Sequence, residues 1–143
     1  MKIAIAADHG GFELKEALKQ HYGAQNWLDL GTDSTTSVDY PDYAKKMAGV
    51  ILSHKAELGI LICGTGVGIS IAANRYKGIR AALVYNAEVA KLAKQHNNAN
   101  ILVFGGRTMA VDDVINSIDT FLHSEYEGGR HQRRLDKIED TEL

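Results

Sequence analysis

The chain has a single cysteine, a single proline and no excess of basic side chains among its 143 residues. One thiol cannot form a disulfide within the chain, so Cys63 indicates a reducing compartment or a chemical role. The formal net charge is -2, whereas nucleic-acid-binding domains usually carry a basic excess. These absences argue against a disulfide-stapled secreted domain and against a nucleic-acid partner.

Long hydrophobic runs are also missing. No stretch reaches the roughly 18 to 20 apolar residues that cross a bilayer, and the apolar run at the N-terminus is too short for a signal peptide. Hydrophobic residues make up 45% of the chain and charged residues 24%, which is typical of soluble proteins. We expect one cytoplasmic domain spanning residues 1–143, with no membrane contact.

Short apolar runs alternate with segments of helical spacing along the chain. The expected strands are residues 2–7, 27–30, 58–62, 79–84 and 101–104, and the expected helices are residues 12–22, 42–54, 69–75, 87–95 and 111–122. A further short helix is expected in the charged tail, residues 128–140. Strict alternation predicts an α/β fold, a Rossmann-like three-layer α/β/α sandwich with a five-stranded parallel sheet plus a C-terminal helix.

Two loops that leave the carboxyl ends of predicted strands carry polar or reactive side chains. Asp8 and His9 follow the first strand, and a glycine-rich loop that begins at Cys63 follows the third. If these strands are neighbours, the loops meet in one pocket. Asp8 and His9 suit the binding of a sugar hydroxyl or assistance in opening a sugar ring, but Asp8 before two glycines is also a common turn residue.

The glycine-rich loop runs Cys63-Gly64-Thr65-Gly66-Val67-Gly68 between a buried strand and a helix. Its amides and the helix N-terminus predict a site for a phosphate or a transient oxyanion. The spacing matches neither a dinucleotide fingerprint nor a P-loop, so a simple tight turn stays open. A helix N-terminus favours the reactive thiolate of Cys63. The alternative is a small buried cysteine that only fills space.

His96 and Asn97 lie between the fourth helix and the fifth strand. An imidazole serves as an acid or base near neutral pH, although His96 equally suits the negative end of the helix dipole. A helix that returns across a parallel sheet ends at the amino edge, so His96 should lie on the far side of its own subunit from Cys63. Either His96 is not catalytic, or it acts in the site of a partner subunit.

Several arginines are candidates for binding a phosphate group. Arg130 and Arg134 are four residues apart and share a helix face, and Arg107 follows the fifth strand. The alternative for the pair is a solvated basic face. The six histidines show no metal-ligand spacing, so no metal site is expected.

Together these motifs resemble one family, the type B ribose-5-phosphate isomerases, with the related galactose-6-phosphate and allose-6-phosphate isomerases. The matching segments are residues 7–12, 39–41, 60–74, 78–81, 95–97 and 127–132. The family implies an aldose–ketose isomerase of the pentose phosphate pathway that interconverts ribose 5-phosphate and ribulose 5-phosphate. A hexose 6-phosphate isomerase and a non-catalytic sugar-phosphate sensor remain alternatives.

The resemblance also implies roles for individual residues. Cys63 accepts the proton, His96 opens the furanose ring and Thr65 shuttles a hydroxyl proton. The residues implied to hold the sugar and its phosphate are Asp8, His9, Gly64, Gly66, Val67, Gly68, Asn97, Arg107, Arg130 and Arg134. Some relatives lack the cysteine and use a glutamate just past the loop, where this chain has Ile69. No cofactor is expected, and the assembly is expected to be a homodimer or tetramer with shared active sites.

Overall fold

The computed structural model describes residues 1–143 as five strands, six α-helices and one short 3-10 helix. In chain order the elements are β1 (Ile3–Ala7), α1 (Phe12–Tyr22), η1 (Ala24–Asn26), β2 (Trp27–Asp29), α2 (Tyr40–Leu52), β3 (Leu58–Cys63), α3 (Val67–Ala73), β4 (Ala81–Leu83), α4 (Ala87–Gln95), β5 (Ile101–Gly105), α5 (Val111–Leu122) and α6 (Arg130–Glu139). The strands form one parallel sheet in the order β2-β1-β3-β5-β4. The predicted α/β class with five parallel strands is confirmed.

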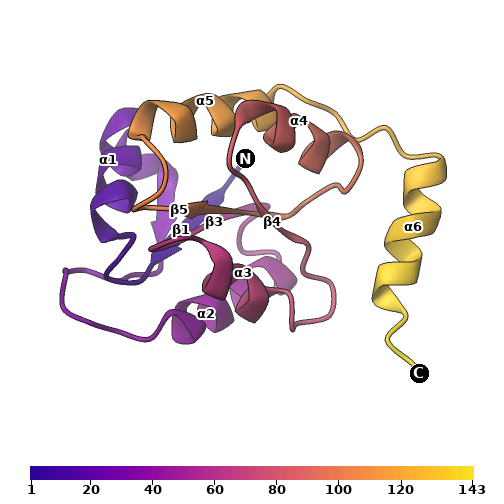
Figure 1. The fold of residues 1–143 in the computed structure, drawn as a ribbon, viewed down its shortest axis with the longest axis horizontal. Helices are drawn as coiled ribbons and strands as arrows, with labels where there is room; N and C mark the ends of the chain where they lie inside the picture. Colours follow the sequence, from indigo (N-terminus) through magenta and orange to yellow (C-terminus); the bar gives the residue numbers. More distant parts are fainter.

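Helices cover both faces of this sheet (Figure 1). Along β3, Ile60 and Ile62 pack on the side of α1, α4 and α5, whereas Leu61 and Cys63 pack on the side of α2 and α3. All six residues of β3 are buried, because a central parallel strand has a hydrophobic layer on each side. The alternation places the Cys63 side chain in the layer of α2 and α3.

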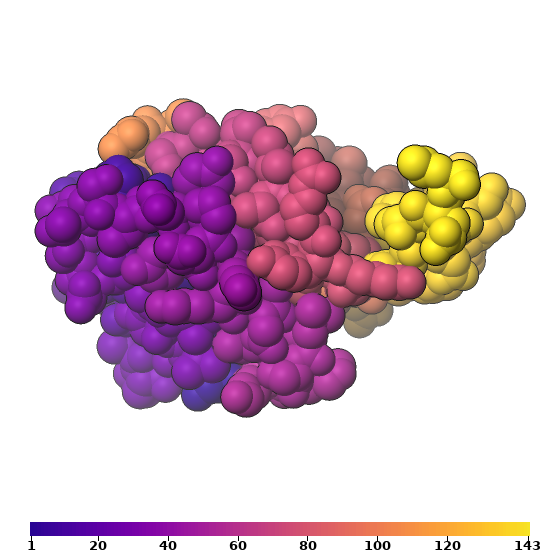
Figure 2. All heavy atoms as spheres, turned by 90° about the horizontal axis from the view of Figure 1, so that it is seen from below, coloured from indigo at the N-terminus to yellow at the C-terminus, as the bar shows by residue number.

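The C-terminal helix α6 stands to one side of this sandwich (Figure 1), and the space-filling view shows the last residues protruding from the body (Figure 2). Only His131 and Leu135 of α6 are buried, and Ile138 is 56% exposed. The helix therefore presents most of its surface to solvent within a single chain.

Most element bounds differ from the sequence predictions by one or two residues, and three of these differences have a clear cause. Helix α2 begins at Tyr40 rather than at residue 42, which places Pro41 within its first turn. Helix α3 begins at Val67 rather than at residue 69, because the left-handed backbone of Gly66 (φ 80°) lets the chain turn directly into it. Strand β4 is limited to Ala81–Leu83, the part that pairs with β5.

Because β1 and β5 both pair with β3, the loops after these three strands meet at one edge of the sheet. A Cβ atom at Gly10 would lie 3.0 Å from the Gly64 amide nitrogen, and one at Gly106 would lie 2.5 Å from the Gly10 carbonyl oxygen. The expected proximity of the first and third loops is confirmed. None of the helices combines the length and apolar character needed to cross a membrane.

Candidate active site

Cys63 is the last residue of β3 and is 5% exposed. The backbone N–H of Gly66 donates a hydrogen bond to its Sγ at 3.2 Å. This contact requires the chain to fold back within three residues, which the positive φ of Gly66 permits. The thiol is therefore held against the N-terminus of α3, as the sequence predicted.

Of the remaining backbone N–H groups of the glycine loop, one donates a hydrogen bond within the chain and the others do not. The Thr65 hydroxyl accepts a bond from the Val67 N–H at 3.3 Å. The N–H groups of Gly64, Thr65 and Gly68 donate to no acceptor in the chain. Free amides beside a helix N-terminus form an anion-binding arrangement.

Asp8 and His9 are both fixed by local contacts. The Oδ1 atom of Asp8 accepts a bond from the Gly10 N–H at 2.8 Å, which is the turn role that the sequence left open. The Nδ1 atom of His9 accepts a bond from the Val38 N–H at 3.1 Å, so the ring is tied to the loop after β2. Asp8 Oδ2 and His9 Nε2 have no protein partner and remain available to a ligand.

Arg107 is anchored to the same loop from β5. Its backbone N–H donates to the Gly64 carbonyl at 2.9 Å, and a Cβ at Gly64 would lie 3.1 Å from its Nη1 atom. The side chain is exposed beside the glycine loop. Three strands thus supply the groups near Cys63.

His96 lies elsewhere, at the C-terminal cap of α4. The register pairs Ile101 with Gly59 and Gly105 with Cys63, so the start of β5 is about 13 Å along the sheet from the level of Cys63. His96 precedes that start, which places it at the amino edge. Its predicted position on the far side of the subunit is confirmed.

The other residues predicted to accompany His96 lie near it. Asn97 follows directly in the chain, and α6 reaches this edge because the Glu127 N–H bonds the Gln95 carbonyl at 3.0 Å. Arg130 and Arg134 are exposed on α6 and form no ion pair. One chain therefore brings the predicted residues together in two separate groups, the Cys63 group and the His96 group.

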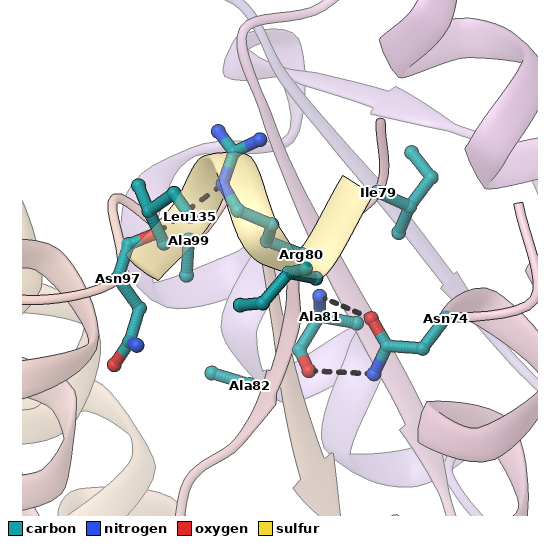
Figure 3. Close-up of a pocket in the computed structure, with 9 residues that line it drawn as sticks. Asn74, Ile79, Arg80, Ala81, Ala82, Asn97, Ala99 and Leu135 are labelled. Atoms are coloured by element: carbon teal, nitrogen blue, oxygen red, sulfur yellow. Dashed lines mark hydrogen bonds between the residues drawn. The ribbon is translucent and has the colours of Figure 1, made fainter. Parts of the chain in front are cut away.

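A cavity of about 370 Å³ is lined by Asn74, Ala82, Asn97, Leu135 and their neighbours (Figure 3), and neither the glycine loop nor Cys63 contributes to its lining. It lies between α6 and the start of β4, and its lining is mostly apolar. Arg80 lines it, but its guanidinium donates to the backbone carbonyls of Asn97 and Asn98. The lining offers no nucleophile or free acid, so this cavity is not the reaction site.

Three side chains beside these groups had no role in the sequence predictions. The Tyr40 ring packs over Gly68, where a Cβ would lie 2.7 Å from Tyr40 Cζ. Glu127 and His131 approach His96, with Glu127 Oε1 lying 3.8 Å from His96 Nε2 and 3.3 Å from His131 Nε2. Tyr40 and Gly68 are 28 positions apart, and Glu127 and His96 are 31 positions apart, so only their place in the matching segments marked these side chains in the sequence.

Comparison with known proteins agrees with this architecture. The model of the Ribose/Galactose Isomerase family matches residues 3–138. Ribose-5-phosphate isomerase B of Escherichia coli is 44% identical over 139 residues, covering 96% of this chain and 93% of that protein.

Two solved structures are similar over nearly their full lengths. The ribose 5-phosphate isomerase of Thermotoga maritima is 54% identical, with a TM-score of 0.95 and 97% of each chain covered. The ribose-5-phosphate isomerase B of Mycoplasma genitalium, solved with bound ribulose-5-phosphate, is 46% identical, with a TM-score of 0.88 and 96% of this chain and 93% of that chain covered. With its parallel sheet, its cysteine at the carboxyl end of β3 and these matches, the chain belongs to the ribose/galactose isomerase family.

Proposed function

We propose that the chain interconverts ribose 5-phosphate and ribulose 5-phosphate through an enediolate, with Cys63 as the base. The observation that carries this proposal is the position of Sγ at the N-terminus of α3, beside the free amides of the glycine loop. The family membership and the ribulose-5-phosphate in the Mycoplasma genitalium relative support the substrate. The chain is thus an aldose–ketose isomerase of the pentose phosphate pathway.

The chemical step moves one proton between adjacent carbons. The Cys63 thiolate removes a proton from the carbon next to the carbonyl, and the negative charge passes to the carbonyl oxygen. The free N–H groups of Thr65 and Gly68 stabilise that oxyanion. The Thr65 hydroxyl relays the hydroxyl proton, and Cys63 returns its proton to the neighbouring carbon. Electrons move only within the sugar, so the reaction needs no redox cofactor.

Substrate binding uses both groups of residues. Asp8, His9 and Asn97 bind sugar hydroxyls, together with the loop that includes Gly64, Gly66, Val67 and Gly68. Arg107, Arg130 and Arg134 hold the phosphate, because their forked donors match its oxygens. His96 donates the proton that opens the furanose ring. Anchoring the phosphate orients a flexible sugar for proton transfer.

The separation of the two groups supports a homodimer with shared sites. His96, Arg130 and Arg134 lie at the opposite edge of the sheet from Cys63, so they reach a Cys63 site only on another subunit. An exposed α6 that protrudes from the body suits such an exchange (Figure 2). We place this assembly in the cytoplasm and treat residues 1–143 as one domain.

The test is a substrate panel of pentose 5-phosphates and hexose 6-phosphates, assayed with a chelator present, for wild type and Cys63→Ala. We expect turnover of ribose 5-phosphate by wild type and a loss of about 10² to 10⁴ in kcat for Cys63→Ala, with unchanged circular dichroism and retained sugar binding. Near-native isomerisation by a folded Cys63→Ala protein would contradict the assignment. A higher kcat/KM for a hexose 6-phosphate than for ribose 5-phosphate would identify the chain as a hexose 6-phosphate isomerase of the same family.

A further inference from the structure

His96, Glu127 and His131 bring three potential metal-ligand atoms together outside the glycine loop. Glu127 Oε1 lies 3.3 Å from His131 Nε2 and 3.8 Å from His96 Nε2, and all three atoms lie within 4.8 Å of one another. The two imidazole rings stack at 4.3 Å with an angle of 15° between their planes. Both Nε2 atoms therefore face the same carboxylate.

The backbone holds this cluster in place from two elements. The Glu127 N–H bonds the Gln95 carbonyl at 3.0 Å, which fixes the loop to the end of α4. His131 is on the first turn of α6, where its N–H bonds the Gly128 carbonyl at 3.1 Å. Glu127 forms no ion pair with an arginine or lysine, so its charge is directed only at the two histidines.

His131 provides an independent sign that the cluster binds something. Its side chain is 4% exposed, and its buried Nε2 forms no well-oriented hydrogen bond, although Glu127 Oε1 lies 3.3 Å away. Buried polar atoms are nearly always paired, and an unpaired one requires an explanation. Here the unpaired atom faces the two other donor atoms of the cluster.

We propose that this cluster binds one divalent first-row transition-metal ion, of which Zn²⁺ is the best match, through His96 Nε2, His131 Nε2 and Glu127 Oε1. Two histidines and a glutamate form a known zinc donor set with one open position. Metal–ligand bonds of about 2.0–2.1 Å in a tetrahedron separate the ligands by about 3.3–3.4 Å. The pair His131–Glu127 already has this spacing. To complete the set, the partly exposed His96 ring must rotate out of its parallel stack on His131, so that its Nε2 lone pair points at the same ion.

The consequence for catalysis rests on the proposed function. A metal ion on His96 Nε2 removes that nitrogen from proton transfer to the sugar, so Zn²⁺ inhibits the isomerase reversibly. Chelation restores the free imidazole and the turnover. Sugar phosphate and Zn²⁺ then compete for the same histidine.

Binding is measured by calorimetric titration of Zn²⁺ at slightly alkaline pH, since only neutral imidazole binds metal. All proteins carry Cys63→Ser, so that the thiol cannot act as a ligand. We expect one ion per chain, with affinity reduced at least about tenfold in Glu127→Gln and in His131→Gln. The exposed His123→Gln is the matched control and should bind as tightly as its parent. Glu127 is half-exposed, so its variant is informative even if His131→Gln folds poorly.

The activity measurement uses chains with Cys63 intact. We expect Zn²⁺ to inhibit wild type and His123→Gln, and a chelator to reverse the inhibition. Glu127→Gln should require at least about tenfold more Zn²⁺ for half-inhibition of its own metal-free rate. No calorimetric binding, or equal affinity in all variants, would overturn the metal site. A wild type without turnover in chelator, but with Zn²⁺ binding that depends on Glu127, would overturn the proposed function and leave the site standing.

Discussion

The amide of Gly66 donates a hydrogen bond to the thiol of Cys63 across a turn of three residues, at 3.2 Å. Gly66 adopts φ 80°, and this conformation both starts α3 and aims its N–H at the sulfur. The geometry of the proposed base thus depends on one glycine that carries no chemical group of its own.

Gly66→Ala tests this dependence, and Gly49→Ala is its matched control. A Cβ at Gly66 would lie 2.6 Å from Leu83 Cδ1 in a left-handed backbone, so we expect a loss of more than about 1 kcal/mol in unfolding free energy. We also expect a loss of roughly tenfold to a hundredfold in kcat from the displaced loop. Gly49 lies in α2 with no atom near its Cβ direction, and Gly49→Ala should stabilise by about 0.5–1 kcal/mol. Denaturant unfolding and steady-state kinetics measure both, and a stable, active Gly66→Ala would refute the prediction.

Arg134→Ala should weaken binding of phosphorylated sugars by roughly tenfold to a hundredfold, because a charge-assisted contact is worth about 1.5–3 kcal/mol. Competitive inhibition by inorganic phosphate measures the contact directly. Arg133→Ala, which removes the same charge from a neighbouring position of α6, should change the inhibition constant little. An inhibition constant that does not change in Arg134→Ala would count against the phosphate role.

Mixing Cys63→Ala and His96→Ala subunits should restore activity if sites are shared. Each mixed dimer then contains one site with both Cys63 and His96 and one site with neither. Since about half of randomly paired dimers are mixed, the mixture recovers about a quarter of wild-type turnover. Refolding the two variants together, followed by the isomerase assay, measures this recovery. If verified mixed dimers have no activity, His96 of one subunit does not act in the same site as Cys63 of the other.

Asp29→Asn tests the ion pairs of Lys15, which is 1% exposed and lies 2.7 Å from Asp29 Oδ2. Burial raises the pKa of Asp29, but hydrogen bonds from Lys15 and Lys19 outweigh it and hold that pKa below its ordinary value. The carboxylate therefore stabilises the fold above the unfolded-state pKa of about 3.9, and this stability is lost as pH falls through the lower folded-state value. At neutral pH we expect Asp29→Asn to lower the free energy of unfolding by about 2 to 3 kcal/mol. The loss is limited to this size because Glu16 still contacts Lys15.

Urea unfolding from neutral to acidic pH measures this effect. The difference in unfolding free energy between wild type and Asp29→Asn should shrink as the solution becomes more acidic than about pH 4. Asp33→Asn removes an exposed carboxylate without an ion pair and should stay within about 0.5 kcal/mol of wild type. A difference that stays constant across this range would show that Asp29 does not act through its charge.

Periodicity located every strand and every α-helix, because a buried parallel strand and an amphipathic helix leave different patterns in the sequence. The start of α3 was misplaced by two residues, since the backbone angle of Gly66 is invisible to such patterns. Chain order at the carboxyl ends of strands also located Asp8, His9 and Cys63 near one another. The stacking of His131 on His96 was not predicted, because residues 35 positions apart meet only after α6 has been placed against the end of α4.

By itself, the sequence determined a parallel α/β fold, a lone thiol at the mouth of a glycine loop and a histidine on the opposite edge. These follow from local rules of strand alternation, helix spacing and the direction of crossover connections. Only the tertiary structure decided which amides remain free beside Cys63, how Glu127 faces two imidazoles, and that α6 projects from the body. Those features depend on side-chain packing and on contacts between distant segments, which no local pattern in the sequence specifies.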